Sequence, residues 1–225
     1  RSSGAEKDVA FTGGGELDNG TTFSMTATTN DAYGISSSTT TITTPSMGSF
    51  TFGSGTGGAS GAYDEEVPQV YEQVSDGNDT VSNKVGDFMD NNHVTYTSPT
   101  FDLGGASITF DLGYASDASD TETSDGGIPK EQATYGTGQE AGVTIAYDAF
   151  KFGIYGAERE NNTQTAAGVD NVRDEFNGVW YAKYSMGPVS VGYSEFYMDA
   201  GVSGTAEATT AAKVLRTAAG IQEGH

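Results

Sequence analysis

The sequence has few of the residues that build several common kinds of functional site. It contains no cysteine, so it can form neither a disulfide scaffold nor a Cys-ligated metal site. Its two histidines, His93 and His225, are too few for a His-rich zinc site. Only 10 Lys and Arg face 31 Asp and Glu, and the net charge of -21 would repel a nucleic acid. No apolar run approaches the roughly 18 residues that a membrane helix needs.

The abundant residues indicate strands. The 225-residue chain holds 32 Gly, 12 Tyr and 11 Phe among many Thr and Val. Disordered acidic tails lack this aromatic and β-branched content, whereas strands are enriched in it. The composition therefore predicts a nearly all-β fold, in a chain long enough to form a barrel.

Alternation of apolar and polar residues predicts ten strands in five hairpins. Turns within each pair are short, as at Asp18-Asn19-Gly20, where Asn-Gly tolerates positive φ. Most connections between pairs are long and acidic. Such alternation of short and long connections is typical of an outer-membrane barrel. The predicted strands lie near residues 7–17, 21–30, 36–45, 49–55, 93–98, 107–114, 143–147, 150–154, 180–184 and 189–193, and the long connections span 56–91, 116–139, 158–177 and the residues from 199 onward.

Two architectures share this strand pattern. In a membrane barrel the apolar faces meet lipid and the polar faces line a watery lumen. In a soluble sandwich the apolar faces form a core. The polar faces here are Thr, Ser and Gly rather than Lys and Glu, and aromatic residues lie near strand ends. Both features favour an all-β, antiparallel transmembrane β-barrel.

Three segments carry a family resemblance. Residues 92–101 read N-H-V-T-Y-T-S-P-T-F and resemble the N-x-V-x-Y-x-S-P-x-F segment of general bacterial porins. Residues 48–53 look like the hairpin that precedes the constriction loop of that family, and residues 15–23 are similar to its early strand pair. The resemblance runs over roughly residues 7–198 and is closest to the acidic porins of alphaproteobacteria.

This resemblance implies a fold and a function. Such porins are 16-stranded barrels, usually homotrimers, set among the lipid and lipopolysaccharide of the Gram-negative outer membrane. Small hydrophilic solutes and ions diffuse through them passively, without a cofactor and without catalysis. A long loop folds inward and narrows the pore, and here residues 53–91 would form it. We expect residues 1–225 to be a single barrel domain, incomplete at both ends.

The chain departs from the family pattern in three respects. Only ten strands are visible, and the C-terminal strand that ends in an aromatic residue has no counterpart at His225. The arginine cluster of the barrel wall also has no counterpart. The four arginines all lie outside the predicted strands: Arg1, Arg159, Arg173 and Arg216.

Carboxylates of the long loop are candidates for the pore constriction. Asp64, Glu65, Glu66 and Glu72 would line its narrowest point, where fixed negative charge favours cations over anions. The alternative is an external, solvated loop whose charges only keep the protein soluble.

Candidate residues of the pore wall come from the polar strand faces. Lys151 and Lys183 point away from the aromatic face, and each lies near a short turn, so both should lie at similar height on neighbouring strands. They would form a basic patch facing the acidic loop, or else isolated charges paired with carboxylates such as Asp148. His93 and Asp111 are further predicted wall residues, and no Ser or Asp arrangement around His93 specifies a catalytic triad.

The acidic connection 116–139 contains a candidate Ca²⁺ site. Asp117, Asp120, Glu122 and Asp125 offer hard oxygen ligands, but their spacing differs from that of an EF-hand, and a hydrated loop is the alternative.

Two further functions compete with a channel. One is an acidic, β-rich surface-array or adhesin protein with Ca²⁺-binding loops. The other is a secreted hydrolase, for which no pair of carboxylates stands at a distinctive spacing. The first is the stronger alternative. It is distinguished from a channel by whether the aromatic strand faces contact detergent or one another.

Overall fold

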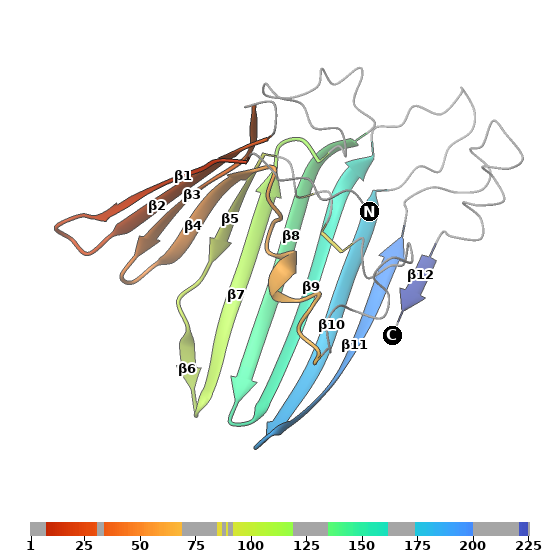
Figure 1. The fold of residues 1–225 in the computed structure, drawn as a ribbon. Coiled ribbons are helices and arrows are strands. Elements are labelled where there is room, and N and C mark those ends of the chain that lie inside the picture. Colours follow the sequence, from red (N-terminus) through yellow and green to blue (C-terminus); the bar gives the residue numbers. More distant parts are fainter. Residues whose placement is uncertain are drawn as a thin grey trace, which may run out of the picture.

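The computed structural model describes residues 8–30, 34–68, 85–86, 89, 92–118, 135–161, 174–199 and 221–224 (Figure 1). These residues form strands and one short 3₁₀ turn, η1 (Ser60–Ala62). The strands are β1 (Ala10–Glu16), β2 (Thr22–Thr29), β3 (Ile35–Thr44), β4 (Gly48–Ser54), β5 (His93–Thr97), β6 (Phe101–Leu103), β7 (Ala106–Ala115), β8 (Tyr135–Tyr147), β9 (Phe150–Asn161), β10 (Glu175–Met186), β11 (Val189–Asp199) and β12 (Ile221–Gly224).

All the strands belong to one antiparallel sheet. Its order follows the chain, β1-β2-β3-β4-β5-β7-β8-β9-β10-β11-β12, with β6 added beside β7. Neighbours in sequence are therefore neighbours in space, as in an up-and-down barrel wall. The all-β, antiparallel fold class is confirmed. Over the described residues, no helix is long and apolar enough to cross a membrane.

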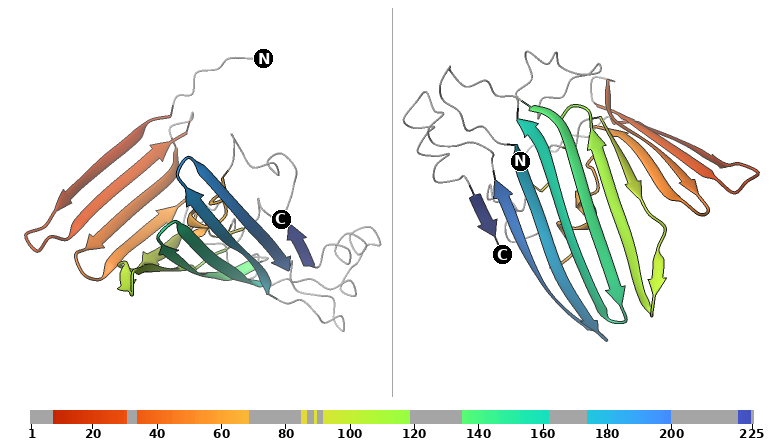
Figure 2. Two further views of the ribbon diagram at one scale, coloured as in Figure 1. Left: turned by 90° about the horizontal axis from the view of Figure 1, so that it is seen from below. Right: turned by 180° about the vertical axis from the view of Figure 1, so that it is seen from behind.

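The sheet is curved, and the segment that follows β4 crosses one of its faces (Figures 1 and 2). We call the face crossed by residues 55–68 the inner face and the opposite one the outer face. The register keeps each row of side chains on one face: Phe110, Val143, Ile154 and Trp180 follow one another across β7–β10 on the outer face.

Short turns join the hairpins, as the sequence predicts. Gly48 shows why one of them needs glycine: its φ is +81°, and a Cβ atom there would lie 2.1 Å from the carbonyl oxygen of Thr97. At the β8–β9 turn a non-glycine residue, Asp148, adopts a positive φ of 52°, a conformation that Asp and Asn tolerate better than most residues do.

The strand count of ten is too low. The residues expected to be a connection around 102–105 contain β6, and β12 lies beyond the last predicted strand. β5 and β6 are separated at Ser98 and Pro99, because proline has no N–H to give to the ladder. Ser98 bridges this break: its Oγ accepts the Phe110 N–H at 2.9 Å, and its own N–H bonds the Phe110 carbonyl at 2.8 Å.

Four strands are longer than the alternation indicates, and one of them is β11, which continues to Asp199. β8 begins at Tyr135, β9 reaches Asn161 and β10 begins at Glu175, so the connections predicted at 116–139 and 158–177 are shorter. The placement of Arg159 outside the strands is wrong, since it lies in β9, 5% exposed. A charged residue interrupts the apolar alternation that predicts a strand, so the prediction stops there. In the structure Arg159 instead pairs with Glu175 on the inner face.

Candidate functional site

The exposed face of the sheet is apolar and the covered face is polar, which is the reverse of the arrangement in a soluble protein. Large apolar side chains are exposed on the outer face: Leu112 is 52% exposed and Ile154 47%. Buried charged and polar side chains lie on the inner face of β7–β10, namely Asp111, Glu140, Arg159, Glu175 and Asn177. Such an arrangement suits a sheet that has apolar surroundings on its outer side and encloses a polar interior.

The segment after β4 is fastened to the inner face by hydrogen bonds. The backbone N–H of Ala59 donates to Oε1 of Glu140 at 2.8 Å, and the Tyr63 hydroxyl donates to Oδ2 of Asp111 at 2.5 Å. The Thr97 hydroxyl donates to the other Asp111 oxygen at 2.6 Å. Each buried carboxylate thus receives the donors that it needs away from water.

Tyr63 fills the centre of this contact. Its side chain is 0% exposed, and its ring stacks on Tyr155 at a centroid distance of 5.3 Å. Tyr181 packs beside it at 6.5 Å. Gly142 lies beneath the ring, where a Cβ atom would come within 2.4 Å of the Tyr63 side chain. Burial first, and then the bond to Asp111, raise the pKa of the Tyr63 hydroxyl well above its ordinary value, so it remains a donor.

Glu66 joins the segment to the two predicted wall lysines. Lys151 and Lys183 lie directly opposite each other on β9 and β10. Both ammonium groups contact the same atom, Oε2 of Glu66, at 2.8 and 2.9 Å. The partner that the alternative interpretation names, Asp148, is not the one found. Lys151 also lies over the Tyr181 ring, 5.7 Å from its centroid.

The two lysines also set the ionisation of Glu66. Burial alone would raise the pKa of its carboxyl, but hydrogen bonds and charges from Lys151 and Lys183 outweigh burial and lower the pKa below its ordinary value. Glu66 is therefore a fixed negative charge at neutral pH.

Further toward the long-loop end of the sheet, a second charged contact lies on the inner face. Arg159 donates from Nε and Nη2 to Oε2 of Glu175 at 3.0 and 2.7 Å, and from Nη1 to the Ala118 carbonyl at 3.0 Å. Both side chains are 6% exposed. Asn177, which is 0% exposed, accepts the Gly86 N–H at 3.0 Å.

The other predicted site residues fall in different surroundings. Asp64 is half-buried, Glu65 is exposed and Asp117 is half-buried. His93 and Asp111 do face inward, but they are buried beside the crossing segment, each 7% exposed, and do not line an open surface. Glu72, Asp120, Glu122 and Asp125 lie outside the described residues. Within the described ranges, no group of three His, Asp or Glu side chains is placed to hold a metal ion.

Sequence reasoning missed Tyr63, Glu140, Tyr155, Arg159 and Glu175. A signal for two of them exists: Glu140 and Arg159 continue the inward period of strands β8 and β9 and could have been assigned to the inner face by counting from Lys151. No comparable signal identifies Tyr63, which lies in the segment between strands.

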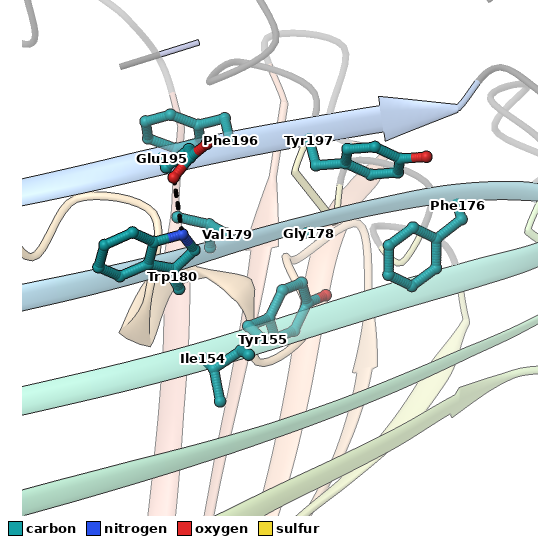
Figure 3. A pocket seen from close by; sticks show the side chains of 9 residues that line it. All are labelled: Ile154, Tyr155, Phe176, Gly178, Val179, Trp180, Glu195, Phe196 and Tyr197. Carbon is teal, nitrogen blue, oxygen red and sulfur yellow. Dashed lines mark hydrogen bonds between the residues drawn. The ribbon is translucent and has the colours of Figure 1, made fainter. Parts of the chain in front are cut away.

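A hollow of about 290 Å³ lies over Gly178 on the outer face (Figure 3). Ile154, Phe176, Trp180 and Tyr197 line it. At its rim the indole N–H of Trp180 donates to Oε2 of Glu195 at 3.0 Å. None of its lining residues is one of the predicted site residues.

An antiparallel sheet with an apolar outer face and a polar, loop-crossed inner face is typical of the wall of a transmembrane β-barrel. Comparison with protein families leads to the same class. The model of the Gram-negative porin family matches residues 2–222, and the chain belongs to this family. Comparison with curated proteins gives no match.

Proposed function

We propose that the protein forms a water-filled channel in the bacterial outer membrane, through which small hydrophilic solutes and ions diffuse passively with a preference for cations. The observation that carries the proposal is the pairing of an exposed apolar outer face with a charged inner face. Phe110 and Val191 are 45% and 59% exposed outside, while Arg159 and Glu175 are each 5% exposed inside. Lipid accepts the first surface, and a hydrated lumen accepts the polar groups beside the second.

The same observation argues against the adhesin or surface-array alternative. A soluble sandwich would cover its aromatic strand faces with a second sheet. The outer-face residues Tyr147, Phe150 and Tyr184 form one row across β8, β9 and β10 and are 56%, 43% and 46% exposed. They lie beside the short turns, where a membrane barrel carries an aromatic girdle.

The charges around the crossing segment support cation preference. Glu66 and its two lysines together keep one positive charge, but the carboxylates of Asp64 and Glu65 stand next to them, and the whole chain carries -21. Carboxylates fixed at a constriction lower the electrostatic cost of a cation and raise that of an anion. We propose further that residues 53–91 form the constriction loop and that Glu72 is one of its negative charges.

Family membership supports the remaining parts of the proposal. Gram-negative porins reside in the outer membrane, so we assign lipid and lipopolysaccharide as surroundings of the outer face and a homotrimer as the assembly. We assign no cofactor and no catalytic reaction to the protein, and leave Ca²⁺ at Asp117 and its neighbours as a secondary proposal.

Single-channel recording of detergent-extracted protein in a planar bilayer under a KCl gradient tests the channel. We expect stepwise, long-lived openings and a reversal potential of the sign for cations. Glu65→Gln should reduce the preference, and Asp18→Asn, which removes the same charge at the short β1–β2 turn, should leave it unchanged. A protein that stays soluble without detergent and gives no openings would refute the channel and favour the surface-protein alternative.

A further inference from the structure

Lys151 and Lys183 form an unusual pair on the inner face. They are direct cross-strand partners, and like charges in that position normally destabilise a sheet. Both ammonium groups converge on a single oxygen, Oε2 of Glu66, at 2.8 and 2.9 Å. The two ammonium groups therefore point at one position, and a negatively charged carboxylate oxygen occupies it.

The charges of this triad do not balance. One carboxylate stands against two ammonium groups, so the site keeps a net charge of about +1. The three side chains are 33%, 27% and 22% exposed for Lys151, Lys183 and Glu66, so water reaches them. When Glu66 turns away, the two ammonium groups carry +2, which a group of charge near -2 would neutralise, and a phosphate monoester carries about -1.5 to -2 at pH 7.

We propose that Lys151 and Lys183 form a binding site for phosphate-bearing solutes inside the channel, and that Glu66 is its internal occupant. This inference rests on the proposed channel, because the solute reaches the lysines through the lumen. A phosphate oxygen replaces Oε2 of Glu66 between the two ammonium groups, and the carboxylate turns to water. No covalent bond forms or breaks.

Glu66 competes from a tethered position. Tyr63 is held by Asp111 on one side of it, and Val67 and Pro68 pack over Gly192 on the other. A short tether of this kind gives an effective concentration on the order of millimolar. The solute must exceed that level to displace the carboxylate, so half-occupancy in the unmodified protein is expected at about a millimolar or above.

A local anion site is compatible with cation preference. Reversal potentials in KCl report the total field of the lumen, to which Asp64 and Glu65 contribute, whereas the lysine pair acts over a distance close to the Debye length of about 8 Å. The channel would then conduct cations preferentially and still retain phosphate-bearing solutes at one point.

Equilibrium dialysis of the intact, detergent-solubilised protein against labelled methyl phosphate tests the site independently of conductance. Glu66→Gln removes the competitor and should tighten binding at least about tenfold. Lys183→Gln should abolish binding, whereas Lys183→Arg should retain it. Glu65→Gln, the matched loss of one neighbouring charge, should shift binding by less than about twofold. Dimethyl phosphate, with one charge less, should bind more weakly.

Single-channel recording separates failure of the site from failure of the channel. Brief current blocks that depend on methyl phosphate and lengthen in Glu66→Gln would support the site. Normal channel openings in KCl without such blocks, together with equal methyl phosphate binding by the unmodified protein and Glu66→Gln in dialysis, would refute the site. The channel proposal would then still stand. Tight binding in Glu66→Gln without any openings would support the site and refute the channel.

Discussion

The inner face of β2–β4 and that of β8–β10 solve the problem of a polar lumen wall in different ways. The first is lined by Thr and Ser in register, and these hydroxyls bond one another: Thr41 to Thr51 at 2.9 Å and Thr43 to Ser49 at 2.8 Å. We call β2–β4 the hydroxyl wall. It carries no charged residue on its inward positions within the described strands.

The second, which we call the charged wall, holds Glu140, Lys151, Arg159, Glu175 and Lys183. The hydrogen bonds given above reach these side chains from the crossing segment, a paired strand or the Ala118 carbonyl. Hydroxyls satisfy each other within the sheet, but buried charges are stable only when another element supplies the opposite charge or a donor. The charged wall therefore depends on tertiary contacts that the hydroxyl wall does not need.

The largest test of this difference is the Arg159–Glu175 pair. Arg159→Met leaves the Glu175 carboxylate buried without its guanidinium and removes the donor to the Ala118 carbonyl. Breaking a buried pair on one side costs about 3–5 kcal/mol. We expect urea unfolding in detergent to show a loss of that size. Arg159→Met with Glu175→Leu should recover most of it, and no recovery would mean that packing, not charge, is responsible.

A smaller effect is expected where the charged wall holds the crossing segment. Tyr63→Phe keeps the ring between Tyr155 and Gly142 but removes the donor to Asp111. A hydrogen bond to a charged group contributes about 1.5–3 kcal/mol. Amide exchange at Asp64 should accelerate roughly tenfold or more. Tyr184→Phe, on the outer face, is the control and should leave exchange unchanged.

Most of the hydroxyl wall could be predicted from the sequence. β2 alternates cleanly between Phe23, Met25 and Ala27 on one face and Thr or Ser on the other, and the turns contain Asn19-Gly20 or Gly48. β3 is almost entirely Ser and Thr, so its own alternation is weak. Period and turn chemistry are local properties, so the sequence exposes them directly.

The charged wall could be predicted only in part. Alternation puts Lys151 and Lys183 on the inner face at equal height, and the register agrees. Their shared partner is Glu66, 117 residues before Lys183, and no local pattern encodes such a contact. Arg159 and Glu175 were missed for the related reason that their charges interrupt the apolar pattern, although each neutralises the other across two strands.

Acidification should loosen the tip of the crossing segment. Because the pKa of Glu66 is lowered in the docked state, its contribution to docking is complete above the ordinary carboxyl pKa and is lost as the pH falls through the lower, docked value. The window lies below about pH 4.3. The chain has no cysteine, so Glu65→Cys accepts one spin label. The mobility of this label should rise as the pH falls through this window. It should not change there in a protein that also carries Glu66→Gln.

The smallest effect is expected in the hydroxyl wall. Thr41→Val and Thr51→Val each remove one member of a half-buried pair, and water can reach the hydroxyl that is left. Cross-strand pairs contribute about 0.2–1 kcal/mol, so each single variant and their coupling in a double-mutant cycle should fall in that range. Urea unfolding in detergent measures all four proteins. A coupling as large as that of Arg159 with Glu175 would show that the hydroxyl wall also depends on strong pair interactions, and the distinction between the two walls would then be one of chemistry and not of energy.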